Sequence, residues 1–295
     1  MNLPLVLLIA VPFVGGLLVI FPGRFLKILR WIFGLLTVVG AGFLLFLCFK
    51  TELGSGFSVW HINFAEKAEQ AIESSSLQFL TSPETLVIAA AFIILYLFVL
   101  LYSIGYYKKG GEADTEYHAL SLFMLGSSLG LLFTQDLIFI YLFWEIAAIA
   151  AWRLIGFERT KTKIAIAART ILINFFGSAL MLIGFMLLVL NSGAVEGGFA
   201  VSKMSLNLAD MGGIMPTLAG ILILAGVFAK SAVIPLYIWV PQAYGASPIP
   251  VVALLAGMIE NLGLVVFMKI FGQTFALEGA WQPALLWIAL ASSLV

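Results

Sequence analysis

The 295-residue chain is 62% hydrophobic and 10% charged, and its 15 basic residues balance 15 acidic ones. An ordinary soluble domain carries about a quarter charged residues, and a nucleic-acid-binding surface needs an excess of basic ones. The composition therefore excludes both classes and predicts an all-α protein that crosses a membrane many times.

A membrane-spanning helix needs about 20 mostly apolar residues. This criterion predicts eight helices and the start of a ninth near Trp281. The expected ranges are 3–21, 25–49, 85–107, 117–134, 137–156, 165–191, 215–241 and 248–271. The first segment is interpreted as a retained helix, because basic residues follow it and none precedes it, the reverse of a signal peptide. The single cysteine, Cys48, lies in an apolar run and permits no intrachain disulfide.

Basic residues in the connections predict the orientation, because they remain on the cytoplasmic side. The connections after the first, third and fifth helices carry Arg24, Lys27, Arg30, Lys108, Lys109, Arg153, Arg159, Lys161 and Lys163. The opposite side carries Lys50, Lys67, Lys203 and Lys269. We therefore expect a multi-pass plasma-membrane protein with its N-terminus outside and the "RLIGFERTKTK" connection in the cytoplasm.

The final segment, "WQPALLWIALASSLV", is short for a spanning helix. Its 15 residues make about 22 Å of helix against a hydrocarbon core of about 30 Å. The carboxylate of Val295 cannot rest unpaired in hydrocarbon. We expect a continuation or a partner subunit to cover this end.

Three ionisable residues lie inside predicted helices: Glu145 in "LIFIYLFWEIAAIAAW", Lys230 in "VFAKSAVIPLYIWVP" and Glu260 in "VVALLAGMIENLGLVVFM". Each is about 12–17 Å from the nearest helix end at 1.5 Å per residue. A charge at this depth costs at least about 2.5–3.5 kcal/mol. Three such residues at one level indicate either a structural ion pair between helices or a relay for protons or cations.

Two features favour the relay. A buried ion pair is a poor source of stability, because desolvation of both ions cancels much of their attraction. The prolines after Lys230 also predict an interrupted helix, since Pro235 has no N–H to donate to the helical ladder, and Pro241, Pro248 and Pro250 follow. Broken helices inside a membrane are tolerated beside protein partners or water and are typical of transporter ion sites.

Two stretches carry a family resemblance: "FWEIAAIAAWRLIGF" and "AKSAVIPLYIWVPQAYGASPIPVVALLAGMIENLG". They resemble the antiporter-like proton-translocating subunits of respiratory complex I, which is an NADH dehydrogenase, of Mrp-type cation/proton antiporters and of membrane-bound hydrogenases. The match covers about Tyr117 to Phe271.

The resemblance implies two inverted five-helix repeats after three leading helices, of which this chain has only the first. The chain is then one membrane domain over 1–295, with three leading helices in 1–110, the five-helix repeat in 117–271 and the start of a ninth helix in 281–295. The repeat contains the fourth to eighth helices.

The resemblance also implies that Glu145 and Lys230 are the family's pair on the ion path. The eighth helix of the family usually carries a lysine or histidine, where this sequence has Glu260 followed by Asn261. A common histidine and a common acidic residue after the two prolines are replaced by Tyr237 and Gln242. These departures put the lateral relay and its ion specificity in question.

Two accessory positions are weaker. His118 begins the fourth helix and is either a proton port or a solvated interfacial histidine. Arg169 lies near the start of the sixth helix, where it is either the family's basic residue or a snorkelling anchor. We expect no catalytic residue, cofactor or metal site in this chain, because the sequence has no phosphate loop and no His/Cys cluster with ligand spacing.

The leading hypothesis is therefore an ion-translocating subunit of a redox-driven or antiporter complex, with Glu145, Lys230 and Glu260 as the relay. Any redox cofactor or quinone would belong to partner subunits. Two alternatives stay open: a structural scaffold subunit that keeps the charged pair without transport, and a quinone-binding subunit. The side chains that face Glu260 discriminate the first two, and an apolar tunnel ending at polar groups would favour the third.

Overall fold

The computed structural model describes residues 3–21, 27–50, 57–62, 75–106, 112–191, 201, 214–273 and 281–294 of the chain. The side chains of some residues at element ends and in the strands lie outside this description. The terminal residue Val295 and five of the basic residues used for orientation also lie outside it: Arg24, Lys67, Lys108, Lys109 and Lys203.

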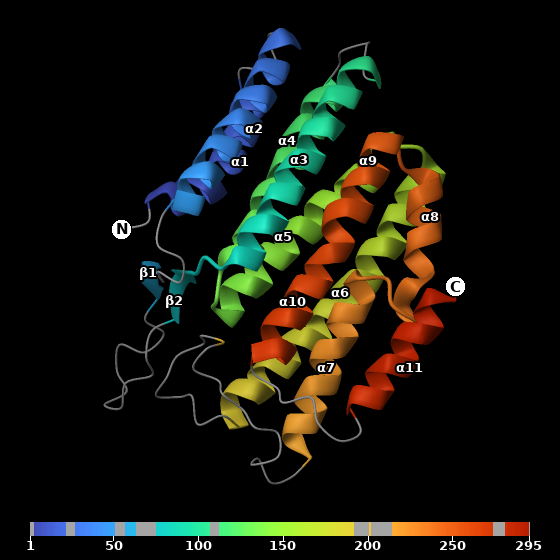
Figure 1. The fold of residues 1–295 in the computed structure, drawn as a ribbon. Coiled ribbons are helices and arrows are strands. Elements are labelled where there is room, and N and C mark those ends of the chain that lie inside the picture. The colour runs from blue at the N-terminus through green and yellow to red at the C-terminus, as the bar shows by residue number, and fades with distance from the viewer. Residues whose placement is uncertain are drawn as a thin grey trace.

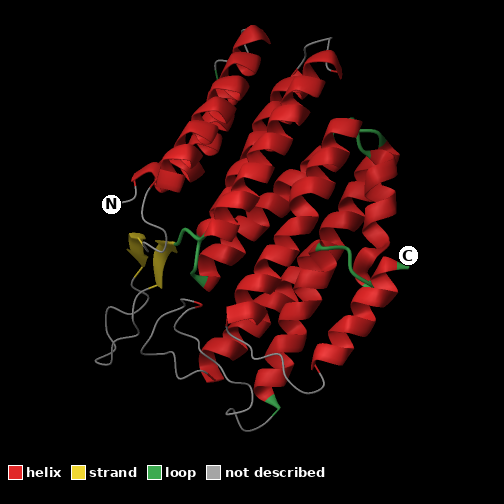
Figure 2. Ribbon diagram, viewed as in Figure 1, coloured by secondary structure: helices red, strands yellow, loops and turns green. Residues whose placement is uncertain are grey.

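The described chain is almost entirely helical, and its helices lie side by side (Figures 1 and 2). The elements before residue 160 are α1 (Leu3–Ile20), α2 (Lys27–Lys50), β1 (Phe57–Ile62), β2 (Ser75–Phe79), α3 (Pro83–Tyr106), α4 (Glu112–Phe133) and α5 (Leu137–Ile155). The later helices are α6 (Lys161–Asn191), α7 (Met215–Lys230), α8 (Trp239–Ala246), α9 (Ile249–Leu254), α10 (Glu260–Gln273) and α11 (Trp281–Ser293). A 3₁₀ turn η3 (Leu236–Ile238) precedes α8, and a π-helical segment η4 (Leu255–Ile259) joins α9 to α10.

The predicted all-α polytopic membrane fold is confirmed. Six helices of the described chain are long and apolar enough to cross a membrane, with α9, η4 and α10 acting as one continuous span. The other apolar segments are α4, which begins with polar residues, and α7, which is only 16 residues long. The helix beginning at Trp281 is also where the sequence predicted it.

Neighbouring helices follow one another across the bundle. α1 packs on α2 and α4, α4 on α5, α5 on α6, and α6 on α7, while α10 contacts both α7 and α4. Small residues allow the α6–α7 approach: a Cβ on Gly226 would lie 2.6 Å from the Cβ of Met181 and 2.8 Å from the carbonyl oxygen of Gly177. Gly226 therefore serves close helix packing.

The two-stranded ribbon of β1 and β2 was not predicted from the sequence. β1 and β2 pair as an antiparallel ribbon within the connection between α2 and α3, beside the helical bundle (Figure 2). An isolated bridge between Phe79 and Thr134 ties the end of β2 to the turn after α4. The ribbon thus reaches the linker that leads into α5.

The break after Lys230 lies earlier than the proline pattern indicates. α7 ends at Lys230, and Ala232 adopts a left-handed conformation with φ of 55°. The amide of Val233 then donates to the carbonyl of Phe228 at 3.0 Å. These two features form a Schellman C-cap, so the helix is already closed before Pro235, which lies in the following turn.

The carbonyl of Ala229, left free by this cap, is also satisfied. The indole Nε1 of Trp239 donates to it at 2.7 Å, so the start of α8 folds back on the end of α7. Ser292 of α11 accepts from the amide of Ile234 at 3.1 Å. The interrupted segment therefore finds partners within the protein, as backbone at membrane depth must.

Candidate functional site

Lys230 is fully buried at the last position of α7. Its Nζ donates to the carbonyl of Trp144 on α5 at 2.9 Å. The same Nζ lies 4.2 Å from the centre of the Trp144 ring, within cation–π range. An uncharged carbonyl and an indole face therefore hold this lysine.

Glu145 follows Trp144 on α5, and the carbonyl of Trp144 is the group that accepts from Lys230. Within the described chain the two residues make no salt bridge at or below 4.0 Å. One carboxylate oxygen of Glu145, Oε1, is buried without a hydrogen-bond partner among the described residues. Glu145 thus lies beside the residue that Lys230 contacts, but it forms no contact ion pair with Lys230.

Glu260 has different partners. Its Oε1 accepts from the hydroxyl of Tyr244 at 2.5 Å, and its backbone carbonyl accepts from Ser231 Oγ at 2.9 Å. A Cβ on Gly263 would lie 1.9 Å from Ser231 Oγ, so only glycine allows α10 to approach the end of α7 this closely. Ser231 follows Lys230 directly, and the helix break is therefore fastened to the backbone of Glu260.

Glu260 is one of the residues that line a cavity of about 730 Å³ between α7, α10 and α11. The cavity wall is largely apolar, with polar groups from Ser231, Asn261, Gln282 and Ser292 beside Glu260. Lys230 lines a different and much smaller cavity of about 10 Å³, on the side of α5, α6 and α8. The structure thus brings Lys230 to α5, and its neighbour Ser231 to Glu260, while Lys230 and Glu260 line separate cavities.

His118 is not the solvated interfacial residue of one sequence interpretation. It is fully buried on α4, with its ring 4.2 Å from Trp31 and 5.0 Å from Tyr117 between ring centres. Neither ring nitrogen has a hydrogen-bond partner among the described residues. The imidazole therefore packs against α2, away from the contacts of Lys230.

The other accessory residues also lie apart from the lysine. Arg169 is exposed on α6. The Asn261 amide donates to the carbonyls of Ala256 and Gly257, both at 3.1 Å, and so satisfies the backbone of the π segment before α10. Pro235 is exposed in the turn between α7 and η3.

Lys269 is a second buried lysine that the sequence analysis missed. It was counted there among the basic residues of the outer side. It is only 5% exposed, and its Nζ donates to the carbonyl of Thr134, just after the end of α4. A cation there is favoured by the negative end of the helix dipole. Lys269 therefore caps α4 from α10, a contact that its position near a helix end did not reveal.

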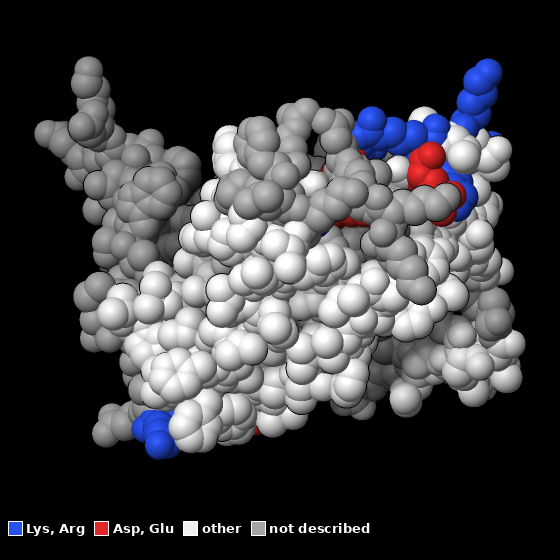
Figure 3. Space-filling view, turned by 90° about the horizontal axis from the view of Figure 1, so that it is seen from above, with Lys and Arg blue, Asp and Glu red and all other residues white. Residues whose placement is uncertain are grey.

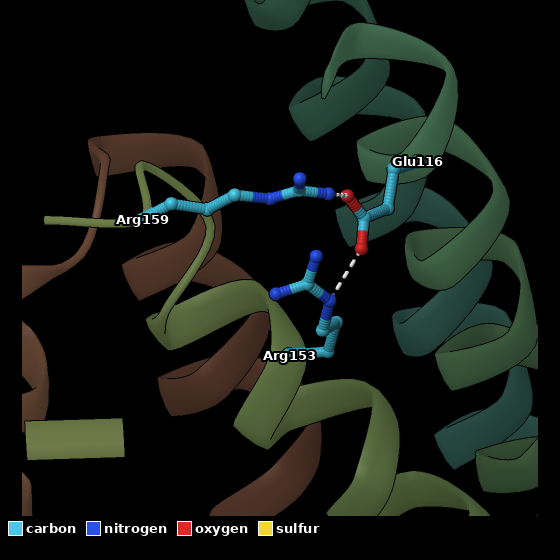
Figure 4. A network of polar contacts seen from close by, with 3 residues as sticks. All are labelled: Glu116, Arg153 and Arg159. Atoms are coloured by element: carbon cyan, nitrogen blue, oxygen red, sulfur yellow. Dashed lines mark hydrogen bonds and ion pairs between the residues drawn. The ribbon is translucent and has the colours of Figure 1, made fainter. Parts of the chain in front are cut away.

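The end of the bundle where α5 ends and α6 begins carries a charged network that we call the basic end: Glu116, Arg153, Glu158, Arg159 and Lys163. Glu116 of α4 accepts with one oxygen from Arg153 and with the other from Arg159, the latter at 2.9 Å (Figure 4). Lys163 pairs with Glu158 at 2.8 Å. In the view of Figure 3, most of the charged side chains gather at one corner and a separate basic group lies at the opposite corner, while much of the remaining described face is uncharged.

The site lies within the part of the chain that matches a known family. The sequence profile described as "NADH:quinone oxidoreductase/Mrp antiporter, TM" matches residues 134–295, which is more than half of the chain. The chain belongs to this family. The resemblance drawn from the Trp144-Glu145 and Lys230-Ser231 stretches is confirmed.

One relative of this chain is a Na⁺/H⁺ antiporter subunit of Bacillus subtilis (strain 168), which is 34% identical over 189 residues. The matched region covers 62% of this chain and 22% of the relative. A Na⁺/H⁺ antiporter subunit of Staphylococcus epidermidis (strain ATCC 12228 / FDA PCI 1200) is 36% identical over 186 residues, with the same shares of both chains. The chain therefore spans about a fifth of the length of these relatives.

Two solved structures share the fold. A chain of the membrane-bound sulfane sulfur reductase, an archaeal respiratory membrane complex, matches 99% of this chain with 57% of its own, at 18% identity and a TM-score of 0.81. A chain of the Mrp complex from Dietzia sp. DQ12-45-1b matches 99% of this chain with 52% of its own, at 20% identity and a TM-score of 0.73. Both similarities are to the arrangement of the helices.

Proposed function

We propose that this antiporter-family chain moves protons, or cations in exchange for protons, as one membrane subunit of a larger redox-driven or antiporter complex. Lys230 is the group that loads and unloads the ion, Glu145 controls its charge, and Glu260 is the next carboxylate along the path. In this proposal the basic end faces the cytoplasm and the N-terminus lies outside, as the positive-inside rule favours.

The observation that carries the proposal is the surroundings of Lys230. A lysine that only holds two helices together is best satisfied by a carboxylate in direct contact. If the two groups separate, each is left as an uncompensated buried charge. Lys230 instead rests on a carbonyl and an indole ring, close to Glu145 but not joined to it. A small movement of Glu145 then changes how strongly the ammonium is favoured, which a relay requires and a scaffold does not.

The partners follow from the same arrangement. α11 has no buried residue in the described chain, and spaces of about 730 Å³ and 650 Å³ lie along it. Further polypeptide from the complex covers this side in our proposal, and the path beyond Glu260 continues there. Redox centres, where the complex has them, belong to other subunits.

The test replaces Lys230 in the complete complex reconstituted into vesicles, with ion movement followed by a pH-sensitive dye. Lys230→Met removes the titrating amine, and we expect coupled transport to fall about a hundredfold, as on loss of a proton-transfer group. Lys230→Arg keeps the positive charge but cannot release its proton under these conditions, so it is expected to fail equally. Transport at the normal rate by the arginine variant, at normal assembly, would contradict the titrating-lysine mechanism and favour the scaffold alternative.

The large cavity supports a second candidate function, quinone binding. Its volume lies within the range of about 300–1,000 Å³ typical of small-molecule pockets, and a few polar groups interrupt an apolar lining. Among the lining residues, Glu260, Ser231 and Gln282 would supply polar groups to a headgroup. A photoreactive quinone analogue that labels the segment around Ser231 and Glu260, with competition by unlabelled quinone, would support this function, and absence of labelling would exclude it.

A further inference from the structure

The small cavity beside Lys230 contains groups that the proposed relay does not use. Its polar lining comes from Lys230 and from two residues of α6, Thr170 and Asn174, one helical turn apart. Thr170 is 4% exposed, and its Oγ1 is buried without a hydrogen-bond partner among the described residues. An orphaned hydroxyl beside a buried ammonium is costly unless a third group joins them.

The donors and acceptors around the cavity are complementary. A lysine ammonium has three N–H donors, and one of those on Lys230 is taken by the carbonyl of Trp144. The amide nitrogen of Asn174 donates to the carbonyl of Thr170 at 3.0 Å, which leaves the amide oxygen of Asn174 as an acceptor. The cavity is therefore lined by a lysine with N–H donors to spare and by two residues with unused oxygen acceptors.

The volume decides what fits between them. A buried water needs at least about 10–15 Å³ of space for its centre and two to four polar partners. The cavity provides about 10 Å³, which is enough for one water and too little for a chain of them. A metal cation is excluded as the occupant, because it would lie against the ammonium of Lys230.

We infer that Thr170 and Asn174 hold a single water molecule against Lys230, in the small cavity that Glu260 does not line. The water solvates the ammonium and fixes its orientation, so Thr170 and Asn174 are positioning residues for the group that carries the ion. The presence of the water is independent of the proposed function, whereas its effect on transport rests on it.

The charged groups near Lys230 determine how loss of the water should change the pH dependence of transport. Glu145 on α5 acts on the lysine electrostatically, and Glu260 begins α10 after the π segment. The remaining cavity lining, from α5, α6, α8 and the π segment, is uncharged. Loss of the water leaves Glu145 in place and removes one neutral contact from the ammonium, which should move the pH profile of transport toward acid.

The experiment has a structural arm and a transport arm, both on the complete complex. A density map that resolves ordered water should show one water within hydrogen-bond distance of Lys230 Nζ and Thr170 Oγ1, and Thr170→Val, which removes the hydroxyl at nearly constant shape, should abolish it. Thr170→Val should also shift the pH of half-maximal transport toward acid by about one pH unit. Thr170→Ser keeps the hydroxyl and should retain both the water and the wild-type profile.

A wild-type map without this water would overturn the inference, whatever the transport result. A water that Thr170→Val removes without any shift in the pH profile would overturn the positioning role. If the wild-type complex moves no ions, the proposed function fails, and the map alone decides the water site.

Discussion

At the basic end Glu116 contacts Arg153 and Arg159 directly, whereas around Lys230 the described chain makes no contact ion pair. The side chain of Arg159 is 66% exposed and that of Lys230 is fully buried. Exposed charges pair at little desolvation cost and gain little stability from pairing. Charges at the bundle end thus pair with one another at the surface, whereas the interior lysine is held by neutral groups.

After loss of Lys230 itself, neutralising the interior carboxylate should give the largest effect on transport. Glu145→Gln keeps a hydrogen-bonding side chain of the same shape, so the protein should insert and assemble normally. Because it removes the charge that favours the ammonium of Lys230, we expect ion transport in vesicles to fall about tenfold or more. Glu145→Asp keeps the charge and serves as the matched control. Unchanged transport by the glutamine variant, at normal assembly, would remove Glu145 from the mechanism.

Lys269 differs from Lys230, because its contact with the carbonyl of Thr134 ends α4. Lys269→Met leaves the carbonyl of Thr134 buried without its donor, so the free energy of unfolding should decrease by about 1–3 kcal/mol. Thermal or denaturant unfolding of the purified complex measures this change. Lys269→Gln restores an N–H donor without the charge and should recover part of the loss. Full stability of the methionine variant would show that Lys269 does not cap α4.

The smallest effect is expected at the basic end. Glu116→Gln should change the free energy of unfolding by less than about 1 kcal/mol and leave the transport rate unchanged, because its ion pairs are partly exposed. The difference from wild type should shrink further as salt is raised, since exposed pairs are screened. A large transport defect in this variant would contradict the proposal that transport depends on the interior residues and not on the ion pairs of the basic end.

Much of the fold followed from residue patterns. Runs of apolar residues predicted the membrane helices, because the length of such a run decides locally whether a segment can span hydrocarbon. The sequence also indicated an interruption after Lys230, since Pro235 and Pro241 cannot continue a helical ladder. It missed the paired strands β1 and β2, whose ribbon forms between segments separated by a connection without clear turn signals.

The exact position of the helix break after Lys230 could not be predicted from neighbouring residues alone. Prolines predicted a break near Pro235, but the helix closes at Lys230 through the left-handed Ala232 and the cap bond from Val233. The carbonyl of Ala229 is satisfied by Trp239, ten residues later. A cap that depends on such a distant side chain can be seen only when the chain is folded.

The residue pattern placed Glu145, Lys230 and Glu260 in the middle of apolar stretches, where a charge is costly and needs partners. Which groups satisfy them follows from the folded arrangement of the helices. It placed Lys230 on the carbonyl and ring of Trp144, Glu260 on Tyr244, and His118 between aromatic rings. The physical reason is that hydropathy depends on one segment alone, whereas a hydrogen bond between helices depends on the rotation and packing of both.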